Sequence, residues 1–238
     1  MNKRETIVII LARGGSKGIP RKNITDLCGK PLISYTIEKA LEVSKIWNLE
    51  VLVSTDDKEI KAISEKYGAW CPFLRPKELA EDNVTSYPVV KHALSEAELI
   101  SGRKYKYIVY LQPTSPLWET KDLVSCLNIL SSSNFNSVVA VTEVDTHPFR
   151  MKRITSGGNL INYIDQGFED MRPRQVLPKV YRRAGSIYAS KRDVIVNKGT
   201  LVDENCYGYL VSRESAVDID TKVDLLTVKS LLESKQIG

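Results

Sequence analysis

The sequence predicts an α/β protein built on a three-layer, doubly wound and mostly parallel sheet. Strand-like apolar runs alternate with amphipathic helical patterns from residue 7 onward, which is typical of this class. The first apolar run ends directly in a glycine-rich loop, and α/β sheets bind their ligands at the carboxyl ends of parallel strands. At 238 residues the chain can form one substantial core. We therefore expect a single domain over residues 1–238 with one inserted arm at residues 145–183.

The first half of the chain has a β-α-β-α order. The strand that begins at Ile7 is followed by a helical pattern that Pro31 opens and that runs to about residue 47. Residues 49–55, LEVLVST, are typical of a second strand, and residues 58–67 of a helix that Gly68 closes. Residues 70–86 are irregular and lead into a helix at about residues 87–100, which Thr85 or Ser86 can cap.

The most convincing central strand is YKYIVYLQ at residues 105–112. Pro113 and Pro116 end it and leave Gln112 at its carboxyl end. A helix at about residues 119–130 and a strand at 136–144 follow. After the arm, strands are expected at residues 184–190 and 206–212, and a last helix at 221–234.

The loop after the first strand carries four cations, Arg13, Lys17, Arg21 and Lys22, and no acid. Its glycines at positions 14, 15 and 18 can adopt backbone conformations closed to other residues and let amide N–H groups approach an anion. The strings of a P-loop and of a dinucleotide fold are absent from the sequence. Four cations this close would repel one another without a counter-anion, so we expect a polyphosphate ligand. The alternative is a flexible surface turn that is basic by chance.

Three further residues, Asp218, Asp220 and Arg75, can be interpreted either as ligand-binding or as purely structural. Asp218 and Asp220 alternate with apolar Val217 and Ile219, which places both carboxylates on one face of an extended chain. A Mg²⁺ ion between them would relieve their repulsion, whereas the plain alternative makes Asp218 a strand end and Asp220 the cap of the last helix. Arg75, between Leu74 and Pro76, is either a ligand-binding cation or a solvated surface arginine.

Residues 145–183 break the regular pattern, with eight Lys or Arg against four acids and several Pro and Gly. A structureless loop of this length is uncommon inside a compact domain. We interpret the segment as an arm with short strands of its own, suited to subunit exchange, whose arginines can recognise a carboxylate. The alternative is a solvated basic flap.

Composition excludes several classes of function. The net charge of +5 is concentrated in the first loop and in residues 150–183, without the regular interleaving of aromatic and basic residues that single-strand binders show, so small anionic substrates are expected rather than nucleic acid. Four scattered cysteines and two histidines form neither a zinc motif nor a disulfide framework. No apolar run approaches the ~20 residues of a membrane span, and no signal-peptide pattern is found, so we expect a cytoplasmic protein without a membrane partner.

These features together resemble a known family, the acylneuraminate cytidylyltransferases, or CMP-sialic acid synthetases. The resemblance covers about residues 6–235, in the order and spacing of that family. It is carried by LARGGSKGIPRKN at 11–23, STD at 54–56, LRPKELA at 74–80, LQPTSPL at 111–117, RPRQ at 172–175, YRRAGSIY at 181–188 and DIDTKVD at 218–224.

The resemblance implies a nucleotidyltransferase of Rossmann-like fold that acts as a homodimer and requires Mg²⁺. It implies transfer of CMP from CTP to the anomeric 2-hydroxyl of a nine-carbon 2-keto sugar acid, with release of pyrophosphate. The implied catalytic residues are Lys22, Asp220 and Arg13; the nucleotide would be bound by Arg13, Gly14, Ser16, Lys17, Lys22, Asn23, Arg75 and Ser86. The sugar acid would be bound by Gln112, Arg150, Arg174, Arg182 and Tyr188, and the metal by Asp218 and Asp220.

The chain departs from the family pattern near the expected N-acyl pocket of the sugar. Leu201 and Val202 stand where aromatic residues are known, and Arg150 stands where lysine is frequent. N-acylneuraminate, legionaminic acid and pseudaminic acid are therefore all candidate substrates. A nucleotidyltransferase for another nucleotide or sugar, and a non-catalytic nucleotide binder, are the further alternatives.

Overall fold

A six-stranded sheet organises the computed structural model, which describes residues 5–237 and the side chains as far as residue 234. The strand order is β10-β6-β9-β5-β1-β4. β9 runs antiparallel to both of its neighbours, and the other pairs are parallel. The prediction of a mostly parallel α/β sheet is confirmed. The strands are β1 Thr6–Leu11, β4 Leu49–Ser54, β5 Tyr107–Leu111, β6 Ser137–Glu143, β9 Tyr181–Lys191 and β10 Cys206–Leu210.

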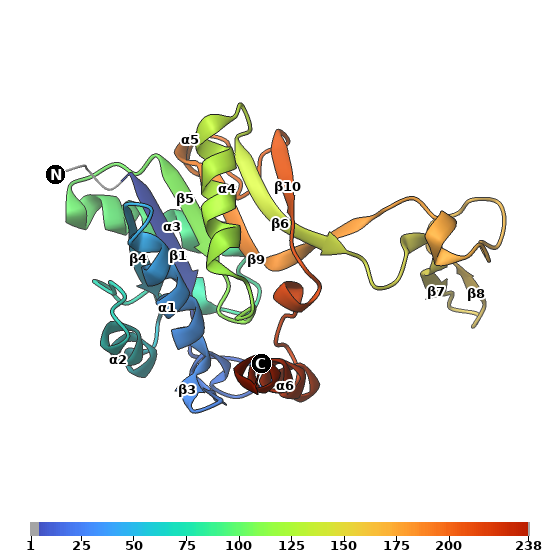
Figure 1. Ribbon diagram of the computed structural model, residues 1–238, viewed down its shortest axis with the longest axis horizontal. Coiled ribbons are helices and arrows are strands. Elements are labelled where there is room, and N and C mark those ends of the chain that lie inside the picture. Colours follow the sequence, from blue (N-terminus) through green and yellow to red (C-terminus); the bar gives the residue numbers. More distant parts are fainter. Residues whose placement is uncertain (1–4, 238) are drawn as a thin grey trace.

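Helices cover both faces of the sheet, which gives three layers (Figure 1). In β1, Val8 and Ile10 face the cluster formed by α1 (Leu32–Ser44), α2 (Lys58–Lys66) and α4 (Thr120–Ser132). Ile7 and Ile9 face the cluster formed by α3 (Ser86–Ser101) and α5 (Arg192–Val196). All four side chains are fully buried, and burying a side chain of this size stabilises the fold by about 1.5–3 kcal/mol. This continuous apolar run is what a strand covered on both faces requires.

The last helix, α6 (Lys222–Ile237), packs away from the main sheet, beside the loop that follows β1. Its Val228 joins Ile19, Leu27 and Ile219 in a third buried cluster. This contact brings the C-terminal segment against the glycine-rich loop. It is the packing that carries Asp220 to the carboxyl end of β1.

Several short elements were absent from the sequence prediction. They are α5, the hairpin of β2 (Asp26–Leu27) and β3 (Lys30–Pro31), and the 3₁₀ helices η1 Lys22–Ile24, η2 Lys77–Ala80, η3 Pro148–Arg150, η4 Arg174–Val176 and η5 Glu214–Ala216. Thr85 does precede α3, but its side chain makes no capping hydrogen bond. β9 begins at Tyr181, earlier than predicted, because its first residues are exposed and basic and carry no apolar pattern.

The segment at residues 145–183 extends beyond the edge of the main body (Figure 1). It contains a separate two-stranded antiparallel sheet of β7 (Lys152–Ile154) and β8 (Leu160–Asn162). Short strands were expected here; the role of the segment in dimerisation stays a prediction. Within the described part of the chain, no helix combines the length and apolar character needed to span a bilayer.

Candidate active site

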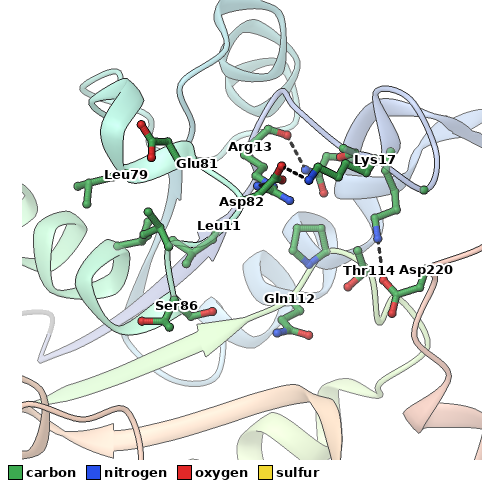
Figure 2. A pocket seen from close by; sticks show the side chains of 18 of the residues that line it. Leu11, Arg13, Lys17, Leu79, Glu81, Asp82, Ser86, Gln112, Thr114 and Asp220 are labelled. Carbon is green, nitrogen blue, oxygen red and sulfur yellow. Dashed lines mark hydrogen bonds and ion pairs between the residues drawn. The ribbon is translucent and has the colours of Figure 1, made fainter. Parts of the chain in front are cut away.

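A cleft of about 440 Å³ opens at the carboxyl ends of β1 and β5. Its size is in the usual range for small-molecule sites. Ten of the residues singled out from the sequence line it: Arg13, Ser16, Lys17, Lys22, Asn23, Arg75, Ser86, Gln112, Asp218 and Asp220. Figure 2 shows Arg13 and Lys17 turned toward Asp82, while Asp220 lies near Thr114. The fold thus brings together residues from the loop, α3, β5 and the C-terminal segment.

Residues 54–57 anchor the glycine-rich loop. Asp56 Oδ1 accepts the Gly14 N–H at 3.0 Å, and Asp57 pairs with Arg21. Asp57 also caps α2 by accepting the backbone N–H groups of its first turn at 2.9 Å. Its hydrogen bond with Arg21 holds the pKa of Asp57 below the ordinary range, so this anchor stays charged. Gly14 therefore acts in the backbone of the loop and does not line the cleft.

The glycines of the loop are needed for space rather than for a left-handed backbone. The loop residue with a positive φ is Arg21, at 56°, and neither Gly14, Gly15 nor Gly18 shares that conformation. A Cβ on Gly18 would lie 2.5 Å from the Asp220 carbonyl oxygen. Our expectation about glycine conformation was wrong, and close approach of the chain at Gly18 is the physical reason for a glycine there.

Carboxylates from other segments neutralise the cations of the loop. Asp82 lies 2.7 Å from Arg13 Nη1 and 2.6 Å from Lys17 Nζ, and Asp220 lies 3.0 Å from Lys22 Nζ. A hydrogen bond from Lys17, aided by one from Arg13, lowers the pKa of Asp82. The argument that these cations repel one another unless a ligand neutralises them was therefore wrong. What still supports an anionic ligand is that Arg13, Lys17 and Lys22 line the cleft.

Arg75 is a buried cation with unused hydrogen-bonding capacity. The residue is 5% exposed, so the alternative of a solvated surface arginine was wrong. Its Nη2 reaches Asp56 Oδ1 at 3.4 Å, whereas its Nε, among the described atoms, has no partner. Burial lowers the pKa of Arg75, although the Asp56 carboxylate opposes that shift. Arg75 thus places in the cleft wall a buried guanidinium whose Nε, among the described atoms, is unpaired.

Asp218 and Asp220 lie in an irregular segment between η5 and α6 rather than on a strand. The Ile219 N–H donates to Thr114 O at 2.8 Å and fixes this segment to the end of β5. Asp218 accepts from Ser115 Oγ at 3.3 Å, and Lys22 Nζ donates to Ile219 O at 2.8 Å. Both carboxylates line the cleft.

The N-cap of α6 is Thr221, not Asp220: Thr221 Oγ1 accepts the Asp224 N–H at 3.3 Å, and Asp224 lies in the first turn of the helix. Asp224 Oδ2 accepts the backbone N–H groups of Asp220 and Thr221 at 3.1 and 2.7 Å. The alternative that gave this capping role to Asp220 was therefore wrong. Asp220 keeps its carboxylate, 74% exposed, on the cleft side beside Lys22.

The remaining sugar-site candidates do not line the cleft of the same chain. Arg150 and Arg174 lie at the arm, where they donate to backbone carbonyls of Arg172 and Val144 at 2.6 and 2.8 Å. Arg182 Nη2 donates to Ala216 O at 3.3 Å. Tyr188 lies beneath the cleft, stacked on Tyr110. Their roles stay predictions.

Sequence reasoning missed several residues that line the cleft. Asp82 gave no signal, because an acid in a polar loop is ordinary. Tyr110 could have been found from strand periodicity, since it lies two residues before Gln112 on the same face of β5. The other cleft residues that were not proposed as site residues are Leu11, Leu79, Glu81, Val84, Val89 and Thr114, whereas Gly18, Thr85 and Pro113 were named only for their structural roles.

Comparison with known proteins decides the family. The profile of the family described as cytidylyltransferase matches residues 7–218. This chain belongs to the cytidylyltransferase family. Among solved structures, a CMP:2-keto-3-deoxy-manno-octonic acid synthetase complexed with CTP has the same fold, with a TM-score of 0.69 at 20% identity over 97% of this chain and 99% of that one.

Cytidylyltransferases named for different sugar acids are about equally similar to this chain. It is 32% identical over 224 residues to an N-acylneuraminate cytidylyltransferase of Streptococcus agalactiae, covering 93% of this chain and 52% of that protein. It is 34% identical over 229 residues to a pseudaminic acid cytidylyltransferase of Campylobacter jejuni (95% and 96% covered). It is 33% identical over 231 residues to a CMP-N,N'-diacetyllegionaminic acid synthase of Legionella pneumophila (97% and 97%). The chain thus spans about half the length of the streptococcal relative and nearly all of the other two.

Proposed function

We propose that this cytidylyltransferase is a CMP-nonulosonate synthetase. It transfers CMP from CTP to the anomeric 2-hydroxyl of a nine-carbon ulosonic acid and releases pyrophosphate. The observation that carries the proposal is the meeting, in one cleft, of the loop cations, the underused guanidinium of Arg75 and the carboxylates of Asp218 and Asp220. The three relatives, which are named as two cytidylyltransferases and a CMP-sugar acid synthase, support the same class of reaction, transfer of CMP to a sugar acid. We place the enzyme in the cytoplasm, where CTP is available.

The triphosphate would bind along the loop. Arg13, Lys17 and Lys22 present cationic groups to the cleft, with Ser16 between them as a hydroxyl donor. Phosphate oxygens would take the place of Asp82 at Arg13 and Lys17, because both interactions use the same N–H donors. Lys22 would then stabilise charge on the departing pyrophosphate, which is the main requirement in phosphoryl-type transfer.

The base would be selected at the inner wall, near Arg75, Asn23 and Ser86. Asn23 is 6% exposed and donates from Nδ2 to Arg13 O at 2.9 Å, which holds the loop close to this wall. Cytosine presents two adjacent acceptors, O2 and N3, whereas uracil presents an N–H at position 3. A guanidinium carries only donors, so Arg75 favours cytosine. Turnover with CTP and not with UTP, GTP or ATP is the expected result.

Asp218 and Asp220 are the residues that would hold Mg²⁺. Magnesium is commonly bound by one or two carboxylates together with substrate phosphates, so a full protein cage is unnecessary. The described residues contain no group of three His, Cys, Asp or Glu side chains that could hold a metal by themselves, so the proposed site depends on the substrate phosphates for its further ligands. The ion would neutralise charge on the phosphate oxygens. Asp220, adjacent to Lys22, would orient the sugar hydroxyl toward the α-phosphorus, and this placement supplies much of the rate.

We also propose a homodimer in which each arm reaches the cleft of its partner. Arg150 and Arg174 lie at the arm, away from the cleft of their own chain. The arm exposes an unusual amount of apolar surface, which is typical of an interface. Its exposed apolar residues are Met151, Ile154, Leu160, Tyr163, Ile164, Phe168, Met171, Val176 and Tyr181.

Light scattering tests the dimer. The expected mass is twice that of one 26.8 kDa chain at micromolar concentration. Ile154→Glu and Met171→Glu place a charge at positions that are 74% and 82% exposed, so the fold of the single chain should tolerate both. Ile46→Glu, at a position 71% exposed on the main body, is the matched control and should stay dimeric. A monomer in the unsubstituted protein would contradict the proposal.

The sugar acid is proposed to be an N-acylneuraminate, with legionaminic and pseudaminic acids as alternatives. Pyrophosphate release with CTP and Mg²⁺ should be measured against N-acetylneuraminate, legionaminic acid, pseudaminic acid and Kdo, with a control lacking sugar. A single preferred nine-carbon acid is the expected result, and Lys22→Ala should remove most of the turnover. Preference for another nucleotide would overturn the base assignment, and CTP binding without turnover on any acid would favour a binding protein.

A further inference from the structure

The hydroxyl of Tyr110 lies between two cleft residues that come from different elements. Tyr110 Oη receives a hydrogen bond from Gln112 Nε2 at 3.0 Å and lies 3.2 Å from Ser86 Oγ at the start of α3. The residue is only 6% exposed. Its ring stacks on Tyr188, its partner across the β5–β9 pair, with centroids 5.5 Å apart. The sheet and this stack therefore fix the hydroxyl in place before any ligand binds.

Chemistry fixes the direction of one of these two hydrogen bonds. The amide nitrogen of Gln112 can only donate, so Tyr110 Oη accepts from it. Between Tyr110 Oη and Ser86 Oγ either hydroxyl can be the donor, and we take Tyr110 as the donor. Burial raises the pKa of Tyr110, which keeps its hydroxyl proton in place at neutral pH. Ser86 Oγ, having accepted from Tyr110, retains its own proton for a group in the cleft.

The carbonyl end of Gln112 faces the opposite way. A Cβ built on Gly185 would lie 3.4 Å from Gln112 Oε1, 3.2 Å from Ser115 Oγ and 3.8 Å from Asp218 Oδ2. Gln112 Oε1 therefore lies on the side of Ser115 and the Asp218 carboxylate, away from Ser86. Figure 2 shows Ser86 and Gln112 as separate walls of the cleft.

We propose that Tyr110 is a positioning residue that links the nucleotide and sugar-acid sites, with its hydroxyl orienting Ser86 as a donor and Gln112 as an acceptor. This inference rests on the proposed function, which assigns Ser86 to the nucleotide and Gln112 to the sugar acid. It specifies the recognised chemistry. Ser86 binds an acceptor of the nucleoside, and Gln112 Oε1 accepts from a hydroxyl or amide N–H of the sugar acid rather than contacting its carboxylate.

The first test is Tyr110→Phe, which keeps the stacked ring and removes the hydroxyl. The dissociation constant of CTP, measured by calorimetry with Mg²⁺ and without sugar, should rise about 3- to 10-fold, the usual effect of one lost hydrogen bond. The KM for the sugar acid should rise by a similar factor. Tyr87→Phe is the matched control, because it removes a part-buried tyrosine hydroxyl that donates to Ile195 O at 3.2 Å but does not line the cleft. Its values should stay within about 2-fold of the unsubstituted enzyme.

The second test separates a link from a merely structural role. The dissociation constant of CTP should be measured for Ser86→Ala, Gln112→Ala and the double variant. The change in the double variant should differ by about 3-fold or more from the product of the two single changes. The same cycle in the Tyr110→Phe background should be additive. Unchanged CTP binding and sugar KM in Tyr110→Phe, or additivity in both backgrounds, would overturn the link. If the unsubstituted protein binds CTP but releases no pyrophosphate with any acid, the proposed function is overturned, while the cycle on CTP binding still decides the link separately.

Discussion

Gly18→Ala tests whether the loop and the carboxylate segment act as one unit. The added Cβ would lie 2.5 Å from the Asp220 carbonyl oxygen, well inside the distance at which carbon and oxygen attract. The obstacle is backbone, so it cannot rotate away. Either the loop or residues 219–220 must move by about 1 Å, a displacement that can cost about 100-fold in rate at a reacting centre. Since Lys22 bonds both Ile219 O and Asp220, its ammonium group shifts with them.

The assay is pyrophosphate release with CTP, Mg²⁺ and the preferred acid. We expect kcat/KM to fall about 100-fold, equivalent to about 2.7 kcal/mol of transition-state stabilisation. Gly18 and Asp220 are both exposed, so the free energy of unfolding should change by less than about 1 kcal/mol. Gly15→Ala is the matched control, because a Cβ there meets nothing within 4 Å, and its effect should stay below about 3-fold. Turnover of Gly18→Ala within 3-fold of the unsubstituted enzyme would refute the reasoning.

Two further substitutions test charges that the fold brings together. Asp82→Asn releases Arg13 and Lys17, so the KM for CTP should fall by up to about 5-fold and become more dependent on salt; a rise in KM would contradict the idea that Asp82 competes with phosphate. Burial of Glu98 disfavours its charged form and would raise its pKa. Hydrogen bonds, of which the one from Arg192 is the strongest, outweigh burial and hold the pKa at about 2, below the ordinary 4.5. The shift corresponds to about 3 kcal/mol of stability at neutral pH, lost as pH falls from about 4.5 toward 2. Urea unfolding should therefore show Glu98→Gln less stable by about 2–3 kcal/mol at pH 7 and by clearly less at pH 3, and an equal difference at both values would contradict the assignment.

The sequence was informative wherever a pattern is local. Continuous runs of apolar and aromatic residues predicted β1 and β5, and Pro113 marked the end of β5. Gln112 could be placed at the carboxyl end of the sheet on this basis alone. Short or exposed elements such as α5 and the first part of β9 gave no such pattern, because a five-residue helix and a basic strand bury too few side chains to show a period.

Contacts between distant segments could not be read from the sequence. Arg75 looks like a surface residue between Leu74 and a proline, yet its backbone N–H donates to Thr55 O at 2.7 Å and draws it into the wall of the cleft. The sequence around Asp220 fitted two roles, a Mg²⁺ ligand and the cap of the last helix. The choice between them depended on Thr221 and Asp224, which form the capping pair of α6 and leave Asp220 to Lys22.

The loop shows why the charge of a segment is a poor guide to the state of its cations. In the sequence, residues 13–23 carry four positive charges and no acid. In the fold, every one of these cations has a carboxylate partner. The ion pairs are Asp82 with Arg13 and Lys17, Asp57 with Arg21, and Asp220 with Lys22. Binding of a triphosphate at Arg13 and Lys17 is then an exchange of one anion for another. Screening by salt weakens both the pair that is lost and the pair that is gained, so the two effects partly cancel. CTP affinity should therefore depend on ionic strength less than the charge of the loop alone suggests, and removal of Asp82 should restore the steeper dependence.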